Sequence, residues 1–147
     1  MPAITLSFDQ NGPIISVFIG ISLPRIQAMR SVNVTPAPPA LGKFLIDTGA
    51  SSTCVAPALI DGLGLPMIGQ VPIMTPSTNG EQHFCDQFDC SLLMPGREGA
   101  AGFHIPAMPI ITTHLRSQGI DGLIGRDVLR LCTLTYIGSA GIYSLGF

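Results

Sequence analysis

Charged side chains are scarce in this chain of 147 residues. Lys and Arg number seven and Asp and Glu nine, so 11% of the residues are charged, where about 25% is typical of soluble domains. A surface with so little charge is hard to keep soluble as a monomer, so part of it is expected to contact another protein or lipid. The net charge of −2 and the lack of a basic cluster argue against nucleic acid as the main partner.

Long apolar runs are also missing. The longest, at 14–23, is interrupted by serine and glycine and is too short to span a bilayer. The first residues show no basic stretch followed by an apolar block, so no export signal is expected. The chain is therefore expected in the cytoplasm, with its thiols reduced. The spacing of His83, Cys85 and Cys90 matches no zinc pattern, so neither a metal nor another cofactor is expected.

The length allows one domain. A chain of this size buries about two-thirds of its surface on folding, so residues 1–147 are expected to form a single domain around one core. Seventeen glycines and thirteen prolines divide the chain into short segments and leave little room for long helices. The segments between them predict a mostly β domain with at most one or two short helices.

The first third of the chain is expected to begin with a hairpin. Strands at 3–8 and 14–23 flank a turn at 10–13 and should pair with each other. The proline-rich segment 24–40 is expected to be a long exposed loop. A short apolar strand at 43–46 then runs directly into an aspartate.

The rest of the chain is expected to hold two more hairpins and one short helix. Asn79-Gly80 should join strands at 71–75 and 82–93, because both residues tolerate a positive φ. A strand is expected at 103–113, and its prolines place it at an edge or make it bulged. A helix within 125–131 and closing strands at 132–137 and 141–147 complete the chain.

One segment carries residues suited to catalysis. At 44–52 an apolar strand breaks into Asp47-Thr48-Gly49, which places a carboxylate beside a hydroxyl on a tight turn that glycine permits. By itself, this tripeptide is also compatible with an ordinary Asx turn, in which the carboxylate accepts hydrogen bonds from nearby amides.

A second segment, at 120–129, narrows the choice. Here an apolar run enters Gly125 and then a short helix that starts at Arg126-Asp127. Together, segments 45–50 and 122–129 resemble the retropepsin-like aspartic proteases, the single-domain kind found in retroviruses and in related bacterial proteins. The resemblance covers nearly the whole chain. It implies an all-β fold, a closed β-barrel protomer with a flap hairpin and one short C-terminal helix.

The resemblance implies an aspartic endopeptidase. Such enzymes use two carboxylates that share one proton around a water, so that one acts as base and the other as acid. Because this chain has one Asp-Thr-Gly, the enzyme would be a homodimer with Asp47 supplied by each protomer. Its substrate would be an extended peptide or protein with apolar residues beside the cleaved bond.

Particular roles also follow from the resemblance. Asp47 would be the catalytic acid and base, Thr48 would join the two loops across the two-fold axis, and Gly49 would contact the substrate backbone. Substrate binding would involve residues of the catalytic loop and the flap tip, namely Ala50, Ser51, Thr78, Asn79 and Gly80. Structural support behind the loop would come from Leu123, Ile124, Gly125, Arg126 and Asp127. The terminal strand at 143–147 would pair with its mate in an intersubunit sheet.

Some positions depart from the retroviral pattern or allow other interpretations. Ser51 stands where retroviral members have an aspartate that pairs with the arginine, so Arg126 is expected to bond backbone carbonyls or another acid. Asp121 is expected to have a turn or helix-flanking role rather than a catalytic one. Two alternatives stay open: a dimerisation or peptide-binding module of the same fold with negligible turnover, and an unrelated small β-barrel.

Overall fold

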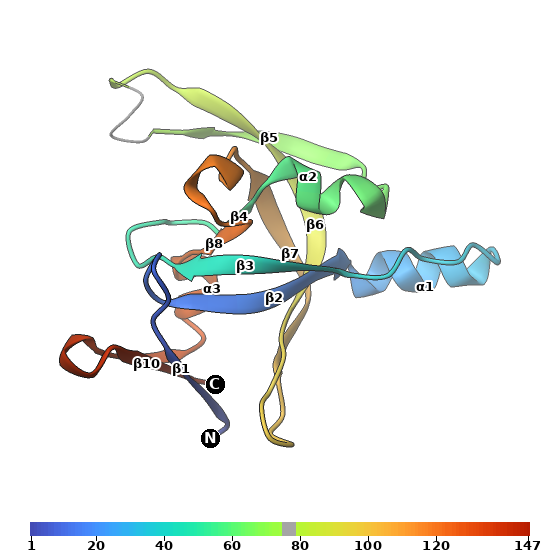
Figure 1. Ribbon diagram of the computed structural model, residues 1–147. Coiled ribbons are helices and arrows are strands. Elements are labelled where there is room, and N and C mark those ends of the chain that lie inside the picture. Colours follow the sequence, from blue (N-terminus) through green and yellow to red (C-terminus); the bar gives the residue numbers. More distant parts are fainter. Residues whose placement is uncertain (75–78) are drawn as a thin grey trace.

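The computed structural model describes residues 1–74 and 79–147, whose strands form two sheets (Figure 1). The smaller sheet has the order β1 (Ala3–Ser7), β10 (Ile142–Gly146), β9 (Thr133–Ile137). The larger has the order β2 (Ile14–Ile21), β3 (Ala40–Ile46), β8 (Gly122–Ile124), β4 (Cys54–Val55), β7 (Phe103–Thr112), β6 (His83–Met94), β5 (Met67–Ile73). Since β2 also pairs with β6, six of these strands close into a barrel. The predicted all-β class with a closed barrel is confirmed.

Helices are short and lie outside the barrel wall. Three are α-helical and three are single 3-10 turns in the described residues: α1 (Leu23–Ser31), α2 (Pro57–Ile60), α3 (Arg126–Leu129), η1 (Asp61–Leu63), η3 (Arg116–Gln118) and η4 (Gly138–Ala140). α3 is the short C-terminal helix that the sequence predicts. No helix in the described residues has the length and apolarity that crossing a bilayer requires.

Alternation of side chains along the strands builds the core. On β2, Ile15, Val17 and Ile19 are at most 3% exposed, while Ser16 between them faces solvent. Burying each such aliphatic side chain contributes about 1.5–3 kcal/mol, so the core determines the register of the strand. On β3, buried Phe44 and Ile46 anchor the strand that leads to the predicted catalytic loop.

The predicted N-terminal hairpin is wrong. β1 pairs antiparallel with β10, from Ala3 opposite Gly146 to Ser7 opposite Ile142, and β2 pairs with β3 and β6. Between β1 and β2, the described structure has a single antiparallel bridge, which pairs Asp9 with Gly12 within the turn. Because β2 buries its apolar face in the barrel, long-range burial outweighs the local turn signal.

Segment 24–40, predicted as a loop, begins with a helix. α1 carries Pro24 in its first turn, where a missing N–H removes no helical hydrogen bond. α1 buries none of its described residues, and Figure 1 shows it projecting away from the barrel. The helix has no apolar stripe along one side, so the periodicity of the sequence does not reveal it.

Two hairpin predictions are confirmed, and so is the prediction that the strand at 103–113 lies at an edge or is bulged. β5 pairs antiparallel with β6 up to Ile73 opposite His83, and β9 pairs with β10. β7 is bulged, because its pairing register with β6 shifts between Cys90 and Leu92. β7 is not a free edge throughout, since its end pairs with β4.

The predicted role of the terminal strand is wrong. β10 lies in the centre of the smaller sheet, hydrogen-bonded to β1 on one side and to β9 on the other. Segment 143–147 therefore has both edges occupied within its own chain and cannot pair with its mate. Tyr143 and Leu145 are fully buried, and the Tyr143 hydroxyl donates to the carbonyl oxygen of Ile14 at 2.6 Å.

Candidate active site

Asp47 lies at the start of a tight loop between β3 and β4. Its N–H donates to the carbonyl oxygen of Ile124 at 3.0 Å, and its own carbonyl accepts from the N–H of Ala50 at 3.3 Å. Its carboxylate oxygen Oδ1 accepts from the N–H of Gly49 at 2.8 Å, which is an Asx turn. Asp47 and Ala50 are half-buried, and Thr48 and Gly49 are exposed, so the loop presents its polar groups to solvent.

The loop is held from behind by β8. This strand lies between β3 and β4, with Leu123 opposite Leu45 in parallel pairing and opposite Cys54 in antiparallel pairing. Ile124 is opposite Ile46, directly before Asp47. Two segments that are more than 70 residues apart in the sequence are therefore joined at the base of the loop.

Arg126 clamps the loop from the first turn of α3. Its Nη1 donates to the carbonyl oxygens of Thr48 and Gly49 at 3.0 and 3.2 Å, and its Nη2 donates to Oγ of Ser51 at 2.9 Å. Its backbone N–H donates to the carbonyl oxygen of Ala50 at 2.9 Å. Of the two partners expected for this arginine, the structure shows the backbone carbonyls.

Replacing Arg126 by Lys is expected to loosen the loop without unfolding the barrel. A lysine ammonium cannot reproduce the planar fork that reaches both backbone carbonyls and Ser51. Because the arginine is exposed, the loss in the free energy of unfolding should be about 1–2 kcal/mol, measured by urea denaturation. Arg130→Lys, at the exposed end of the same helix, is the control and should change stability little. Equal effects of the two substitutions would contradict the clamp.

Thr53 is a site residue that sequence reasoning missed. It is fully buried, and its Oγ1 donates to Oδ1 of Asp127 at 2.7 Å while its N–H donates to Oδ2 at 2.8 Å. The same Oγ1 accepts from the N–H of Gly125 at 3.1 Å. The two residues thus tie the start of β4 to the start of α3. The sequence signal that could have pointed to Thr53 is a hydroxyl side chain placed between the Asp47 loop and the apolar strand that follows it.

Asp121 has a structural role, as the sequence predicts. Its Oδ2 accepts from the N–H of Lys43 at 3.0 Å, and its Oδ1 pairs with Nε of Arg116 at 3.2 Å. Its backbone also bonds Lys43 and Ala56. The carboxylate is therefore engaged in joining the entry of β8 to β3.

Three thiols, Cys54, Cys85 and Cys90, are buried in the described structure, and the pKa of two of them is raised strongly. Burial, with smaller contributions from the neighbouring Cys85, Asp47 and Asp127, raises the pKa of Cys54 to about 12. Burial also raises the pKa of Cys90 to about 12, with a contribution from Asp89. All four cysteines lie in the described part of the chain and are free thiols. Near neutral pH Cys54 and Cys90 are protonated, and a thiol in that form is a poor nucleophile.

Stability is expected to fall at alkaline pH because of these two thiols. Their folded pKa lies above the unfolded value of 9.0, so the protonated form stabilises the native state fully below pH 9 and progressively less as the pH rises toward about 12. Urea denaturation at about pH 7.5 and about pH 10.5 measures the loss. A Cys54→Ala/Cys90→Ala variant should lose less stability over the same interval, and an unchanged pH dependence would contradict the assignment.

Two of the three predicted flap residues lie at the described tip of the β5–β6 hairpin. Asn79 and Gly80 are exposed there, with φ of 49° and 83°. Thr78 lies outside the described residues. Across residues 1–74 and 79–147, no three His, Cys, Asp or Glu side chains come together to hold a metal ion.

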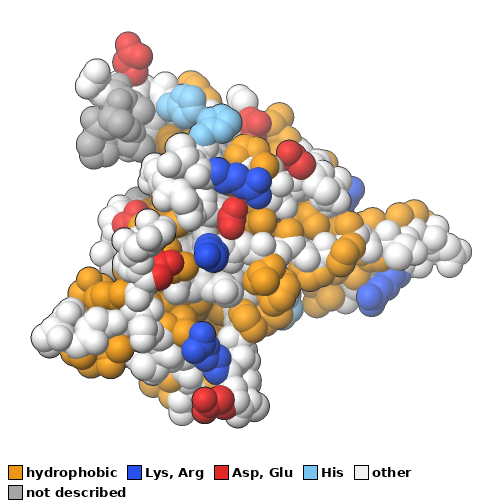
Figure 2. Space-filling view, viewed as in Figure 1, with side chains coloured by type: hydrophobic (Ala, Val, Ile, Leu, Met, Phe, Trp, Pro, Cys, Tyr) orange, Lys and Arg blue, Asp and Glu red, His pale blue; other side chains and the backbone are white. Residues whose placement is uncertain are grey.

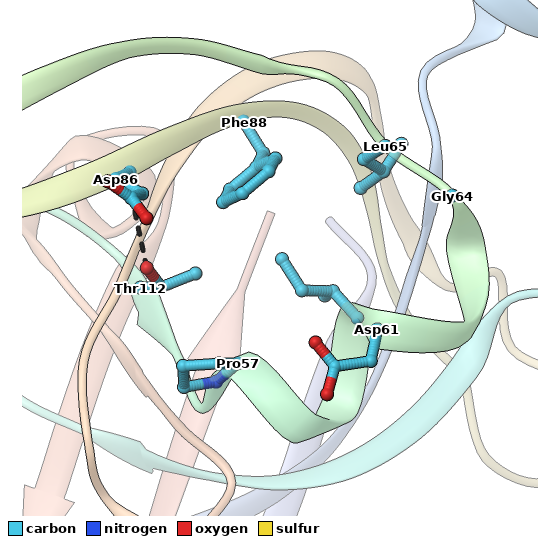
Figure 3. Close-up of a pocket in the computed structure, with 8 residues that line it drawn as sticks. Pro57, Asp61, Gly64, Leu65, Asp86, Phe88 and Thr112 are labelled. Carbon is cyan, nitrogen blue, oxygen red and sulfur yellow. Dashed lines mark hydrogen bonds between the residues drawn. The ribbon is translucent and has the colours of Figure 1, made fainter.

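A pocket of about 280 Å³ lies between β6 of the same hairpin and the α2–η1 segment (Figure 3). Asp61 and Asp86 lie on opposite sides of it, and the ring of Phe88 lies on the same side as Asp86. The carboxylate of Asp86 already accepts a hydrogen bond from Nε2 of Gln70 at 2.9 Å. The pocket contains none of the residues of loop 47–53 and is therefore separate from the candidate active site.

Comparison with known proteins identifies the class. A family model described as aspartyl protease matches residues 39–128, which include the Asp47 loop and the Gly125-Arg126-Asp127 segment. Because the match spans more than half of the chain, the protein belongs to the aspartyl protease family.

The fold narrows the class further. The structure is similar to the crystal structure of a retropepsin-like aspartic protease from Rickettsia conorii, with a TM-score of 0.59 and 15% sequence identity. The similarity covers 99% of this chain and 91% of that chain. The fold is therefore retropepsin-like, as predicted. No curated protein matches this sequence.

Proposed function

We propose that this protein is a homodimeric endopeptidase that hydrolyses peptide bonds with a pair of Asp47 side chains, one from each protomer. The observation that carries the proposal is the support of the Asp47 loop. β8 holds it from behind, Arg126 clamps its backbone, and the carboxylate is half-buried at its start. A loop held in this way keeps a reacting group in place, which general acid–base catalysis requires.

In the proposed reaction, two Asp47 carboxylates share one proton and hold a water between them. Like charges at such short range do not both ionise, so one carboxylate is a base and the other an acid. The base removes a proton from the water as its oxygen attacks the carbonyl carbon, and the acid protonates the carbonyl oxygen. The tetrahedral intermediate then breaks its C–N bond as a proton passes to the leaving amine.

Other residues of the loop and the hairpin would bind the substrate. Thr48 would join the two loops across the two-fold axis, and Gly49, Ala50 and Ser51 would line the path of the peptide backbone. The β5–β6 hairpin would close over the peptide as a flap, with Thr78, Asn79 and Gly80 at its tip, and exclude water. We also propose that the protein acts in the cytoplasm.

Cleavage of a peptide library by the purified protein tests the proposal. The library is incubated at about pH 4 to about pH 7, where a shared-proton dyad is active, with the Asp47→Asn variant as the matched control. The proposal requires cleavage by the wild type and none by the variant. Equal cleavage by both would remove Asp47 from the mechanism, and dimers that do not cleave would indicate a peptide-binding module instead.

A further inference from the structure

The pocket of about 280 Å³ between β6 and the α2–η1 segment combines an apolar lining with two carboxylates. The apolar side chains that line it are Pro57, Ile60, Leu65 and Phe88. Asp61 and Asp86 line it on opposite sides (Figure 3). No Lys, Arg or His belongs to the lining that the described residues form, so nothing in the wall offsets the two acids.

These two carboxylates are not neutralised elsewhere in the described structure. Among its residues, the one ion pair joins Arg116 and Asp121. Asp121 stands in the segment whose residues repeat those at 60–63, so Asp61 has the same sequence neighbours but lacks the arginine. Charged side chains are few in this chain and scattered over the face seen in Figure 2. A small pocket with two unpaired carboxylates attracts cations.

The lining favours an organic cation over a metal ion. Within residues 1–74 and 79–147, no three His, Cys, Asp or Glu side chains come together. The ring of Phe88 lies on the same side of the pocket as Asp86, and an aromatic face attracts a guanidinium or ammonium group. The apolar side chains suit the methylene stem of such a group. The volume is just below the range of about 300–1,000 Å³ for small-molecule sites, so it suits one side chain or a small amine.

The pocket lies where the β5–β6 hairpin leaves the barrel wall. Over residues 83–86, β6 pairs with β5 alone, and its pairing with β7 begins at the next residue. Asp86 is therefore the last residue before the wall, and its carbonyl oxygen accepts from Oγ1 of Thr112 at 3.4 Å. Asp61 directly follows α2, whose last two residues are buried in the core. A ligand held by both carboxylates would join the hairpin to the barrel.

We propose that this pocket binds a guanidinium or primary ammonium group between Asp61 and Asp86 and thereby braces the base of the β5–β6 hairpin. The group comes from a free amine or from a basic side chain of a polypeptide, since both present the same charge on an alkyl stem. Binding does not depend on the protease assignment. Its consequence rests on the proposed function: a braced hairpin opens less readily, so peptides enter the site more slowly.

An NMR titration of the Asp47→Asn chain measures binding without cleavage. The cationic probes are agmatine, a free amine, and the end-blocked peptide Ala-Ala-Arg-Ala-Ala. The same peptide with norleucine in place of arginine is the neutral control. We expect saturable binding with a millimolar Kd, about tenfold or more tighter than for the neutral peptide. The amide resonances of Gly64 and Thr112, which belong to the lining, should shift. The tighter of the two cationic probes identifies the source of the group.

Replacing both acids tests the site, with a third acid of the same strand as the control. Asp61→Asn/Asp86→Asn should raise the Kd about tenfold or more, because hydrogen bonds to charged groups are about twice as strong as neutral ones. Asp89→Asn removes a half-buried carboxylate of β6 that is outside the lining, and it should change the Kd less than about twofold. Equal thermal unfolding of the variants is the control for folding.

Two results would overturn the site: no saturable binding of either cationic probe up to about 50 mM, or binding that Asp89→Asn weakens as much as the double variant does. The brace has its own test in the chain that retains Asp47. Saturating agmatine should slow peptide cleavage about twofold or more and leave the double variant unaffected, and an unchanged rate at saturation would overturn the brace. If agmatine binds but this chain cleaves no peptide, the site stands and the protease assignment fails.

Discussion

Asp47→Asn is expected to lower kcat/KM for peptide cleavage by about 10³-fold or more while leaving the fold intact. Removal of a general acid or base typically lowers the rate by about 10²–10⁴-fold. Here both members of the pair are lost at once. The amide oxygen of Asn can still accept the hydrogen bond from the N–H of Gly49 that Asp47 Oδ1 accepts at 2.8 Å. The loop therefore keeps its shape, and the loss reports on proton transfer alone.

A mixing experiment tests whether two chains share one site. With wild-type and Asp47→Asn chains in equal amounts and random pairing, about one dimer in four holds two Asp47 residues. Activity at constant total protein should then fall to about a quarter of the wild-type value. A fall to about one half, as independent chains would give, contradicts a shared site. Equal thermal unfolding of the two proteins is the control for folding.

Gly125→Ala is expected to destabilise the protein by about 3 kcal/mol or more. A Cβ at this position would lie 2.5 Å from the carbonyl carbon of Ser52, 2.7 Å from its oxygen and 2.9 Å from the nitrogen of Thr53. All three are backbone atoms of the Asp47 loop, so no side chain can rotate to make room. The φ of −89° at Gly125 is open to any residue, so the glycine is required for close approach and not for an unusual dihedral.

Gly62→Ala is the matched control for this prediction. Gly62 lies in the segment Ile60-Asp61-Gly62-Leu63, which repeats the residues at 120–123, and a Cβ there meets no described atom within 4 Å. The substitution should change the free energy of unfolding by about 1 kcal/mol or less, on the stabilising side. Urea denaturation of both variants gives the comparison. A Gly125→Ala protein as stable as Gly62→Ala would show that the loop is free to move.

The hydrogen bonds of Thr53 explain why the Gly125→Ala change should also affect the site. Its hydroxyl accepts from the Gly125 N–H and donates to Asp127. An added methyl group would push the loop backbone away from this hydroxyl and leave buried polar groups without partners, which is costly. We therefore expect any folded Gly125→Ala protein to lose peptide cleavage together with stability.

Local motifs in the chain were sufficient to predict the class of the protein and to single out Asp47 as its candidate reacting group. Strand alternation and the Asn79-Gly80 turn depend on residues close together in sequence, and they predicted the mostly β class, the β5–β6 hairpin and α3. The closed barrel followed from the resemblance that the two glycine-containing motifs carry. The expected partners of Arg126 followed from one substitution, Ser51 in place of an acid. The catalytic role of Asp47 remains a prediction until cleavage is measured.

Contacts between distant segments decided the rest. The pairing of β1 with β10 rather than β2, the bonds from Thr53 to Asp127 across 74 positions, and the occupied edges of the terminal strand all join opposite parts of the chain. α1 forms without an apolar stripe. Strand propensity and turn signals show where a strand begins and ends. They do not show which strand lies beside it, because that choice depends on the apolar area buried when the whole barrel closes.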